Sequence, residues 1–160
     1  LGARVVAVDP AAASRRLAQE LGAEVTLDVT DAVADSVRQV TGGGAHVSLD
    51  AVGSAPTAVA SVLSLRRRGR HVQVGLLFGP EATPPLPMDR VVAQELEIYG
   101  SHGMSARDYA GLLDLVRSGR VRPERLVGRV VGLADAGEAL AGLGRPGRAP
   151  GLTVVDLSRT

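Results

Sequence analysis

An aspartate that ends a short apolar run is the residue with the clearest chemical potential near the start of the chain. Asp9 follows Val5-Val6-Ala7-Val8, and Pro10 then opens a helical pattern. A β-branched run of this length is typical of a strand buried in a parallel sheet. Open α/β sheets bind ligands beyond the carboxyl ends of their strands, where an acid can accept hydrogen bonds from the ribose hydroxyls of a dinucleotide. The sequence therefore predicts a nucleotide-binding carboxylate, with a helix-capping role for Asp9 as the structural alternative.

The other candidate groups favour ordinary structural roles. His46 and His71 precede apolar runs, and we expect both to be surface or strand-entry residues. His102 lacks a neighbouring acid or cysteine, so it is a poor candidate for a catalytic base. A basic cluster formed by Arg66, Arg67, Arg68 and Arg70 has no interleaved aromatic residues and is expected to be a solvated turn at a helix end. No spacing of His, Asp and Glu predicts a metal site.

The elements that must position these groups alternate along the chain. Apolar residues at helical spacing predict helices over 14–21, 33–40 and 134–143, and shorter helical turns over 89–94. Ser54 is expected to cap one further helix, and Ser105 with Asp108 to form a capping box before another, which Gly119 ends. Strands are expected over 4–8, 25–27, 71–76, 96–100, 126–131 and 152–156, and a strand with its exit turn is expected over 47–53. This alternation predicts a Rossmann-like, doubly wound α/β fold with a parallel sheet.

Composition limits the kind of protein. The 160 residues suffice for one domain, and the formal net charge of +1 gives no reason to expect nucleic acid as a partner. The sequence contains no Cys, which excludes disulfides and thiolate zinc sites within it. No apolar run approaches the ~20 residues needed to cross a bilayer, and no signal peptide is recognisable. We therefore expect no membrane partner and a cytoplasmic location.

The start of the chain has an echo further along. Leu1-Gly2-Ala3 precedes one apolar run, and Leu21-Gly22-Ala23 follows a helical pattern and precedes the next. By analogy, Leu1-Gly2 is the tail of a helix whose body lies upstream. A dinucleotide fingerprint would place its glycine-rich turn about 20 residues before the acid, which is also upstream. We therefore expect a partial Rossmann domain over 1–160 that lacks its first strand and its glycine-rich turn.

The ordered set AVD, LGAE, LDAVG, VQVGL, ELEIYGSHGM and LLDLVRSGRV resembles the nucleotide-binding domain of zinc-dependent, medium-chain alcohol dehydrogenases. The resemblance covers nearly the whole chain. It implies cofactor contacts from the adenosine end to the nicotinamide end at Asp9, Ser14, Asp50, Ala51, Val52, Gly53, Val74, Gly75, Leu76, Gly100, Ser101 and His102. The family often has a basic residue near Ser14, for which Arg15 or Arg16 would have to substitute here. The charge of Asp9 disfavours the extra phosphate of NADP, so NAD is the expected cofactor, and the departure at Ser14 leaves NADP as the alternative.

The resemblance also implies what the chain does not carry. The family holds its catalytic zinc in a separate, preceding GroES-like domain, so no catalytic and no metal-binding residue is expected in this segment. In the whole protein, a hydride would pass between a small alcohol or aldehyde and the cofactor. The family commonly pairs the strand equivalent to 96–100 with its copy in a second subunit, which implies a homo-oligomer.

Three alternative functions remain open from the sequence. The first is a zinc-free quinone or enoyl reductase built on the same domain plan. The second is an S-adenosylmethionine-dependent methyltransferase, since these enzymes also place an acid after the second strand of a wound sheet. The third is a non-catalytic nucleotide-binding module.

Overall fold

The computed structural model describes residues 2–143 and 150–159, which form two compact units. Unit 1 comprises residues 1–28 and 104–160, and unit 2 comprises residues 29–103. Leu1, on which the expected upstream helix partly rests, lies outside the described residues. Among the described residues, no helix has the length and apolar character needed to cross a bilayer.

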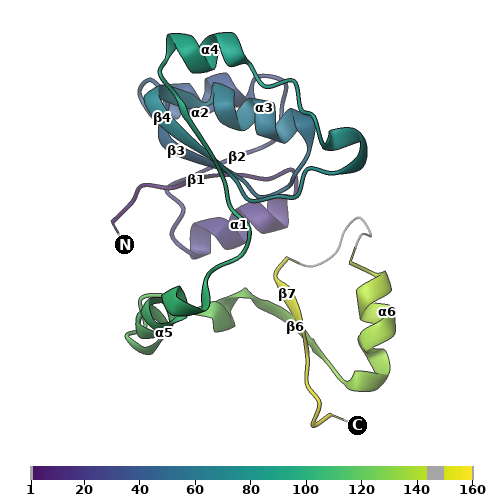
Figure 1. The fold of residues 1–160 in the computed structure, drawn as a ribbon. Helices are drawn as coiled ribbons and strands as arrows, with labels where there is room; N and C mark the ends of the chain where they lie inside the picture. The colour runs from purple at the N-terminus through teal and green to yellow at the C-terminus, as the bar shows by residue number, and fades with distance from the viewer. Residues whose placement is uncertain (1, 144–149, 160) are drawn as a thin grey trace. The chain divides into compact units, whose positions relative to one another are not determined.

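Unit 1 contains two pairs of parallel strands (Figure 1). Strand β1 (Val6–Val8) pairs with β2 (Val25–Leu27), and helix α1 (Ala12–Glu20) connects them. Strand β6 (Val127–Val131) pairs with β7 (Leu152–Val155), and helix α6 (Ala136–Ala141) lies between them in sequence. Helix α5 (Tyr109–Arg117) is followed by Ser118 and then by Gly119, whose φ of 69° is the left-handed conformation that glycine tolerates.

Unit 2 is a three-stranded parallel sheet with its helices. The strand order is β3 (Ala45–Asp50), β4 (Leu65–Gln73) and β5 (Glu97–Gly100). Helix α3 (Ala55–Leu63) packs against β3 and β4, and α2 (Val33–Val40) packs against α3 (Figure 1). Helix α4 (Met88–Ala93) precedes β5 and contributes Val91 to the core around Val62, Leu65 and Leu96. Short 3₁₀ turns occupy Gly79–Glu81, Ala106–Asp108, Pro123–Leu126 and Leu133–Asp135.

The expected parallel α/β architecture is confirmed, because each described strand pairing is parallel and helices alternate with strands. The caps explain two of the helix boundaries. Ser54 and Thr57 form a reciprocal capping box at the start of α3, as the prediction of a Ser54 cap requires. Gly22, with a φ of 109°, follows α1. Val33 and Val37 are buried on α2, as their spacing predicts. On α3, Ala58 and Val62 are buried, and Val59 and Leu63 are half-buried.

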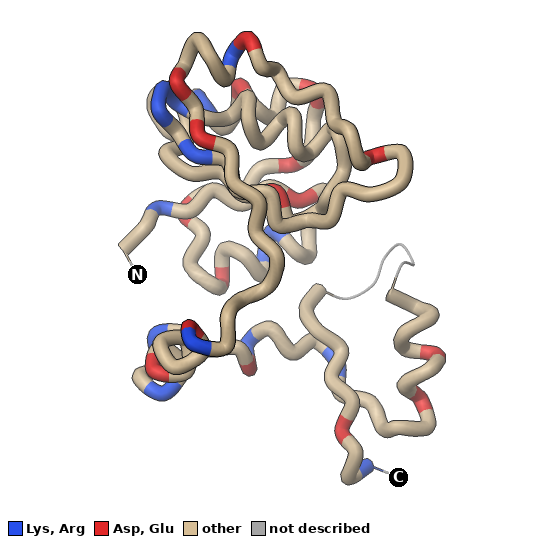
Figure 2. The backbone as a smooth tube through the Cα atoms, in the orientation of Figure 1, with Lys and Arg blue, Asp and Glu red and all other residues tan. Residues whose placement is uncertain are grey.

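Two local predictions are wrong. The arginine cluster is exposed to solvent as expected, but it is part of β4 and not a turn at a helix end; three extra residues bulge out between the pairs Ala45–Leu65 and Val47–Arg70. Arg68 takes a left-handed φ of 59° there, so the bulge has turn-like geometry within a strand. In Figure 2, blue segments gather where Figure 1 labels β4. The capping box at Ser105 does not form either. Its hydroxyl donates to the Asp108 carboxylate, at 2.6 Å, instead of accepting from a backbone N–H.

Candidate functional site

Asp9 lies directly beyond the carboxyl end of β1, in unit 1. Its backbone N–H donates to the Leu27 carbonyl, at 3.2 Å, so the exit from β1 stays attached to β2. Its Oδ1 accepts from the Ala11 N–H at 2.7 Å. Because Ala11 is itself the residue that precedes α1, this bond shapes the turn before the helix and does not cap the first helical turn. The carboxylate is thus held in a defined orientation through one of its two oxygens.

Arg15 braces this strand end from α1. Its Nη1 donates to the carbonyls of Asp9 and Pro10, at 2.6 and 2.9 Å, and its Nη2 lies 3.1 Å from the Asp28 carboxylate. The side chain is only 19% exposed, so the guanidinium is built into the turn. Ser14 is half-buried one residue earlier, and Arg16 is exposed. Of the two arginines suggested as the basic partner of a phosphate, Arg15 is therefore engaged by the backbone.

Asp28 is a residue that the sequence reasoning missed. It follows β2 just as Asp9 follows β1, so the two acids end neighbouring parallel strands. The sequence signal that could have identified Asp28 is the one that identifies Asp9: an acid directly after a short apolar run.

In unit 2, the turn after β3 is organised around the Asp50 carboxylate. Asp50 is 3% exposed. Its Oδ1 accepts from the N–H groups of Val52 and Gly53, at 2.9 and 3.2 Å, and its Oδ2 accepts from the Gln73 amide at 2.7 Å. Burial alone would raise the pKa of Asp50, but these hydrogen bonds, with one from Thr57, outweigh it and lower the pKa below its ordinary value. The carboxylate is ionised and turned inward, where it fixes the turn.

The turns after β3 and β4 touch through their backbones at two glycines. A Cβ on Gly53 would lie 2.4 Å from the Leu76 carbonyl oxygen, and a Cβ on Gly75 would lie 2.2 Å from the Gly53 nitrogen. Gly53 also has a φ of 82°. Only glycine allows this approach at both positions. Ala51, Val52, Val74 and Leu76 lie beside the glycines, and the side chains of Val52 and Leu76 are 73% and 62% exposed.

The third predicted segment lies at the same edge of this sheet. Ser101 follows β5, and its N–H donates to the Gln73 carbonyl at 2.9 Å. Gly100, Ser101 and His102 are all exposed. The structure therefore brings 50–53, 74–76 and 100–102 together at the carboxyl ends of three neighbouring parallel strands. Asp9 and Ser14 belong to unit 1.

The interpretation of His71 as a surface or strand-entry residue is wrong. Its side chain is 1% exposed and lies in a polar chain between Ser61 of α3 and Gln73 of β4. Gln73 was also missed, although a glutamine between the valines of an expected buried strand was a visible irregularity. His46, by contrast, is exposed in β3, and its Nε2 accepts from Arg66 at 2.6 Å.

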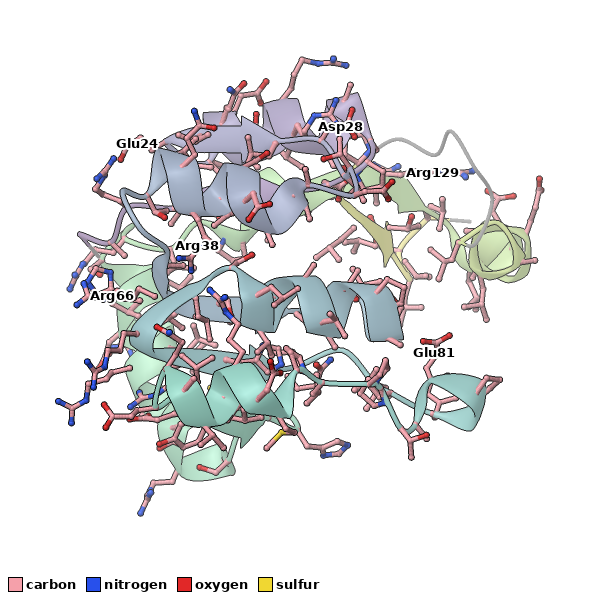
Figure 3. The ribbon with its side chains drawn as sticks, turned by 90° about the horizontal axis from the view of Figure 1, so that it is seen from above. Glu24, Asp28, Arg38, Arg66, Glu81 and Arg129 are labelled. Carbon is pink, nitrogen blue, oxygen red and sulfur yellow. The ribbon has the colours of Figure 1, made fainter. Side chains whose placement is uncertain are left out.

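The loop after β4 is anchored to a helix by Glu81. Its Oε2 accepts from the N–H of Ala55, the first residue of α3 (Figure 3 labels Glu81 beside the end of this helix). A carboxylate at a helix N-terminus meets a free donor and the positive end of the helix dipole. The contact ties the segment after 74–76 to the helix that follows 50–53.

The described residues do not fit a zinc ion. Among them, no group of three or more His, Asp or Glu side chains is arranged to hold a metal. Zinc in proteins takes three or four such donors, often including cysteine, and the sequence has none of the latter.

Comparison with known proteins gives a consistent result. The family model described as zinc-binding dehydrogenase matches residues 1–118. A probable alcohol dehydrogenase of Mycobacterium tuberculosis is 38% identical over 128 residues, which are 78% of this chain and 35% of the relative. A 2-dehydro-3-deoxy-L-galactonate 5-dehydrogenase of Pseudoalteromonas atlantica is 30% identical over 144 residues, which are 89% of this chain and 41% of the relative.

A solved structure agrees with the sequence relatives. The crystal structure of an NAD-dependent alcohol dehydrogenase matches with a TM-score of 0.85 and 31% identity, over 98% of this chain and 44% of that one. The chain thus spans less than half the length of these proteins. With most of its residues matched by the family model, the chain belongs to the zinc-binding dehydrogenase family.

Proposed function

We propose that this chain is the nucleotide-binding part of an oxidoreductase that transfers a hydride between an alcohol and NAD. The observation that carries the proposal is the edge of unit 2 where three parallel strands end together and two glycine turns are in backbone contact. Open α/β sheets bind dinucleotides at such edges, and small residues let a flat ligand lie close to the backbone. The alcohol dehydrogenases among its relatives support the same reaction class.

Asp9 is proposed to hold the adenosine ribose. A carboxylate that ends a strand of a parallel sheet accepts hydrogen bonds from the ribose hydroxyls and repels a 2′-phosphate. The Ala11 N–H orients the carboxylate through Oδ1. Arg15 could offset a phosphate charge, but its guanidinium is bound to two backbone carbonyls and to Asp28. Both features favour NAD over NADP.

The three turns of unit 2 are proposed to carry the rest of the cofactor. Residues 51–53 would lie under the adenine ring, and 74–76 and 100–102 would present backbone groups to the nicotinamide amide. The chain's own part in the reaction is then to bind and orient the cofactor while the cofactor supplies the hydride chemistry. Because the described residues do not fit zinc, we propose that zinc and the substrate are held by residues outside this chain.

We also propose that the whole protein is a homo-oligomer. Strand β5 ends the order β3-β4-β5, and its four residues are exposed, so its outer side is available for pairing. An edge strand of this kind is a template for a second copy. Sedimentation of the whole protein tests this proposal, and a monomer at micromolar concentration would contradict it.

The cofactor assignment is tested by cofactor titration of the whole protein that contains this chain. Asp9→Ala should weaken NAD binding by about tenfold, as expected for lost hydrogen bonds to a charged group, and should narrow the preference over NADP. Asp35→Ala, on the exposed face of α2, is the matched control and should bind both cofactors like the parent. Unchanged affinity of Asp9→Ala for both cofactors would rule out the role. Thermal stabilisation by S-adenosylmethionine instead of NAD would support the methyltransferase alternative.

A further inference from the structure

A continuous chain of polar side chains runs beneath the glycine turns of unit 2. Ser61 of α3 lies 2.9 Å from His71 Nδ1, and His71 Nε2 lies 3.2 Å from Gln73 Oε1. Gln73 Nε2 then donates to Asp50 Oδ2 at 2.7 Å and to the Gly75 carbonyl at 2.8 Å. The chain crosses from a helix through one strand to the exit turns of two strands.

The partners of Gln73 fix the direction of its hydrogen bonds. Gln73 Nε2 faces two acceptors, so the amide orientation is set and its Oε1 must accept from His71 Nε2–H. The other ring nitrogen, His71 Nδ1, is hydrogen-bonded to the Ser61 hydroxyl. Both donors and the acceptor of the Gln73 amide are thus used.

Gln73 joins the two turns that form the proposed cofactor platform. Through Asp50 it reaches the N–H groups of Val52 and Gly53, and through its second donor it holds the Gly75 carbonyl. The backbones of the same two turns are in contact at Gly53 and Gly75, so their relative position has little freedom. A leucine or isoleucine would serve packing inside a parallel strand, but neither could make these bonds.

We propose that Gln73 is a positioning residue for the dinucleotide: its amide sets the separation and tilt of turns 50–53 and 74–76, on which the cofactor lies. Gln73 acts through Asp50 and Gly75 and does not itself touch the cofactor. The inference rests on the proposed function, because that function makes these two turns the cofactor platform.

The test replaces the Gln73 amide in two ways and measures the NAD affinity of the whole protein. Gln73→Met keeps the length of the side chain but removes both donors. NAD should bind about tenfold more weakly, with the same factor from pH 5.5 to pH 8.5. Gln73→Glu places a second carboxyl against the Asp50 carboxylate. It should bind NAD weakly at pH 8.5 and recover most of the affinity at pH 5.5, where a shared proton restores one hydrogen bond.

A matched control separates this effect from a general response to charge. Gln39→Glu makes the same chemical change on the exposed side of α2 and should bind NAD like the parent at both pH values. Affinities are measured well below each variant's melting temperature, so a loss of stability alone leaves the dissociation constant unchanged. Melting temperatures at both pH values record whether each variant is folded, and Gln73→Met supplies the result if Gln73→Glu does not fold.

The outcomes are distinct. Weaker binding by Gln73→Met and pH-dependent weakening by Gln73→Glu support the inference. If the parent binds NAD and both Gln73 variants bind it equally well at each pH, the positioning role is overturned while the proposed function stands. If the parent binds neither NAD nor NADP, the proposed function fails and the positioning role falls with it.

Discussion

Replacing Gly75 with alanine should force apart the two turns after β3 and β4. A Cβ at this position would lie 2.2 Å from the Gly53 nitrogen and 2.6 Å from the Val52 carbonyl carbon. Ordinary contacts between such atoms are about 3.5 Å, so the backbones must separate by roughly 1 Å. The neighbouring atoms are backbone atoms and cannot rotate away. Gly75 has no positive φ, so the cost comes from the contact alone.

The expected cost is about 2 kcal/mol of unfolding free energy, within the usual 1–3 kcal/mol for forcing extra volume into a packed site. Separation of the turns also strains the hydrogen bonds from Gly75 N–H to the Asp50 carbonyl and from Gln73 to the Gly75 carbonyl. In a protein of this size such a loss corresponds to about 4–8 °C in melting temperature. Urea unfolding of the full chain at pH 7, followed by circular dichroism, measures it.

Gly111→Ala is the matched control. A Cβ on Gly111, in α5, would have no atom within 4 Å, and its φ is not positive. The same chemical change should therefore stabilise the protein by about 0.5–1 kcal/mol, because alanine is the better helix former. A Gly75→Ala variant as stable as the parent would refute the backbone contact between the turns, and with it the platform on which the cofactor proposal depends.

Three further outcomes are expected. Ser54→Ala removes the capping box of α3 and should lower the free energy of unfolding in urea by about 1 kcal/mol. An unchanged free energy of unfolding would show that other contacts hold the start of the helix. Glu81→Gln keeps an acceptor for the Ala55 N–H but removes the charge, so it should cost about 0.5 kcal/mol, and a larger loss in low salt than in high salt would identify the dipole as the cause. Asp50 has a lowered pKa in the folded state, so its stabilising contribution is complete above its unfolded pKa of about 3.9 and is lost as pH falls through the folded value. Asp50→Asn should therefore lose stability at pH 7 and show a shallower decline in acid, and an unchanged acid profile in urea midpoints would contradict this.

Much of the fold could be predicted from local signals. Short β-branched runs gave β1 and β2 nearly to the residue, and the spacing of Val33, Val37 and Val40 gave the limits of α2. Glycines after the helices acted as expected, since Gly22 and Gly119 both have positive φ. These features depend on a few adjacent residues, so they are legible without tertiary information.

The incorrect predictions depended on contacts that no single short segment reveals. The bulge in β4 depends on where β3 begins to pair, which no property of the arginine cluster itself reveals. His71 is buried only because Ser61 and Gln73 satisfy its ring nitrogens from two other positions. Asp50 was expected as a cofactor contact, and the structure adds that its carboxylate faces inward and shapes the turn. The cofactor contacts themselves stay predictions. Most of them involve backbone groups, and these leave little trace in the sequence.

The bulge in β4 divides the strand into an irregularly paired amino end and a regularly paired carboxyl end. Its three surplus residues lie at the amino end, where Arg67 and Arg68 have side chains that are 69% and 80% exposed, and regular pairing resumes at Val47 and Arg70. The alignment of Gln73 with Asp50 is therefore set by the pairs from Val47–Arg70 onward, and these two exposed arginines lie outside that part of the ladder.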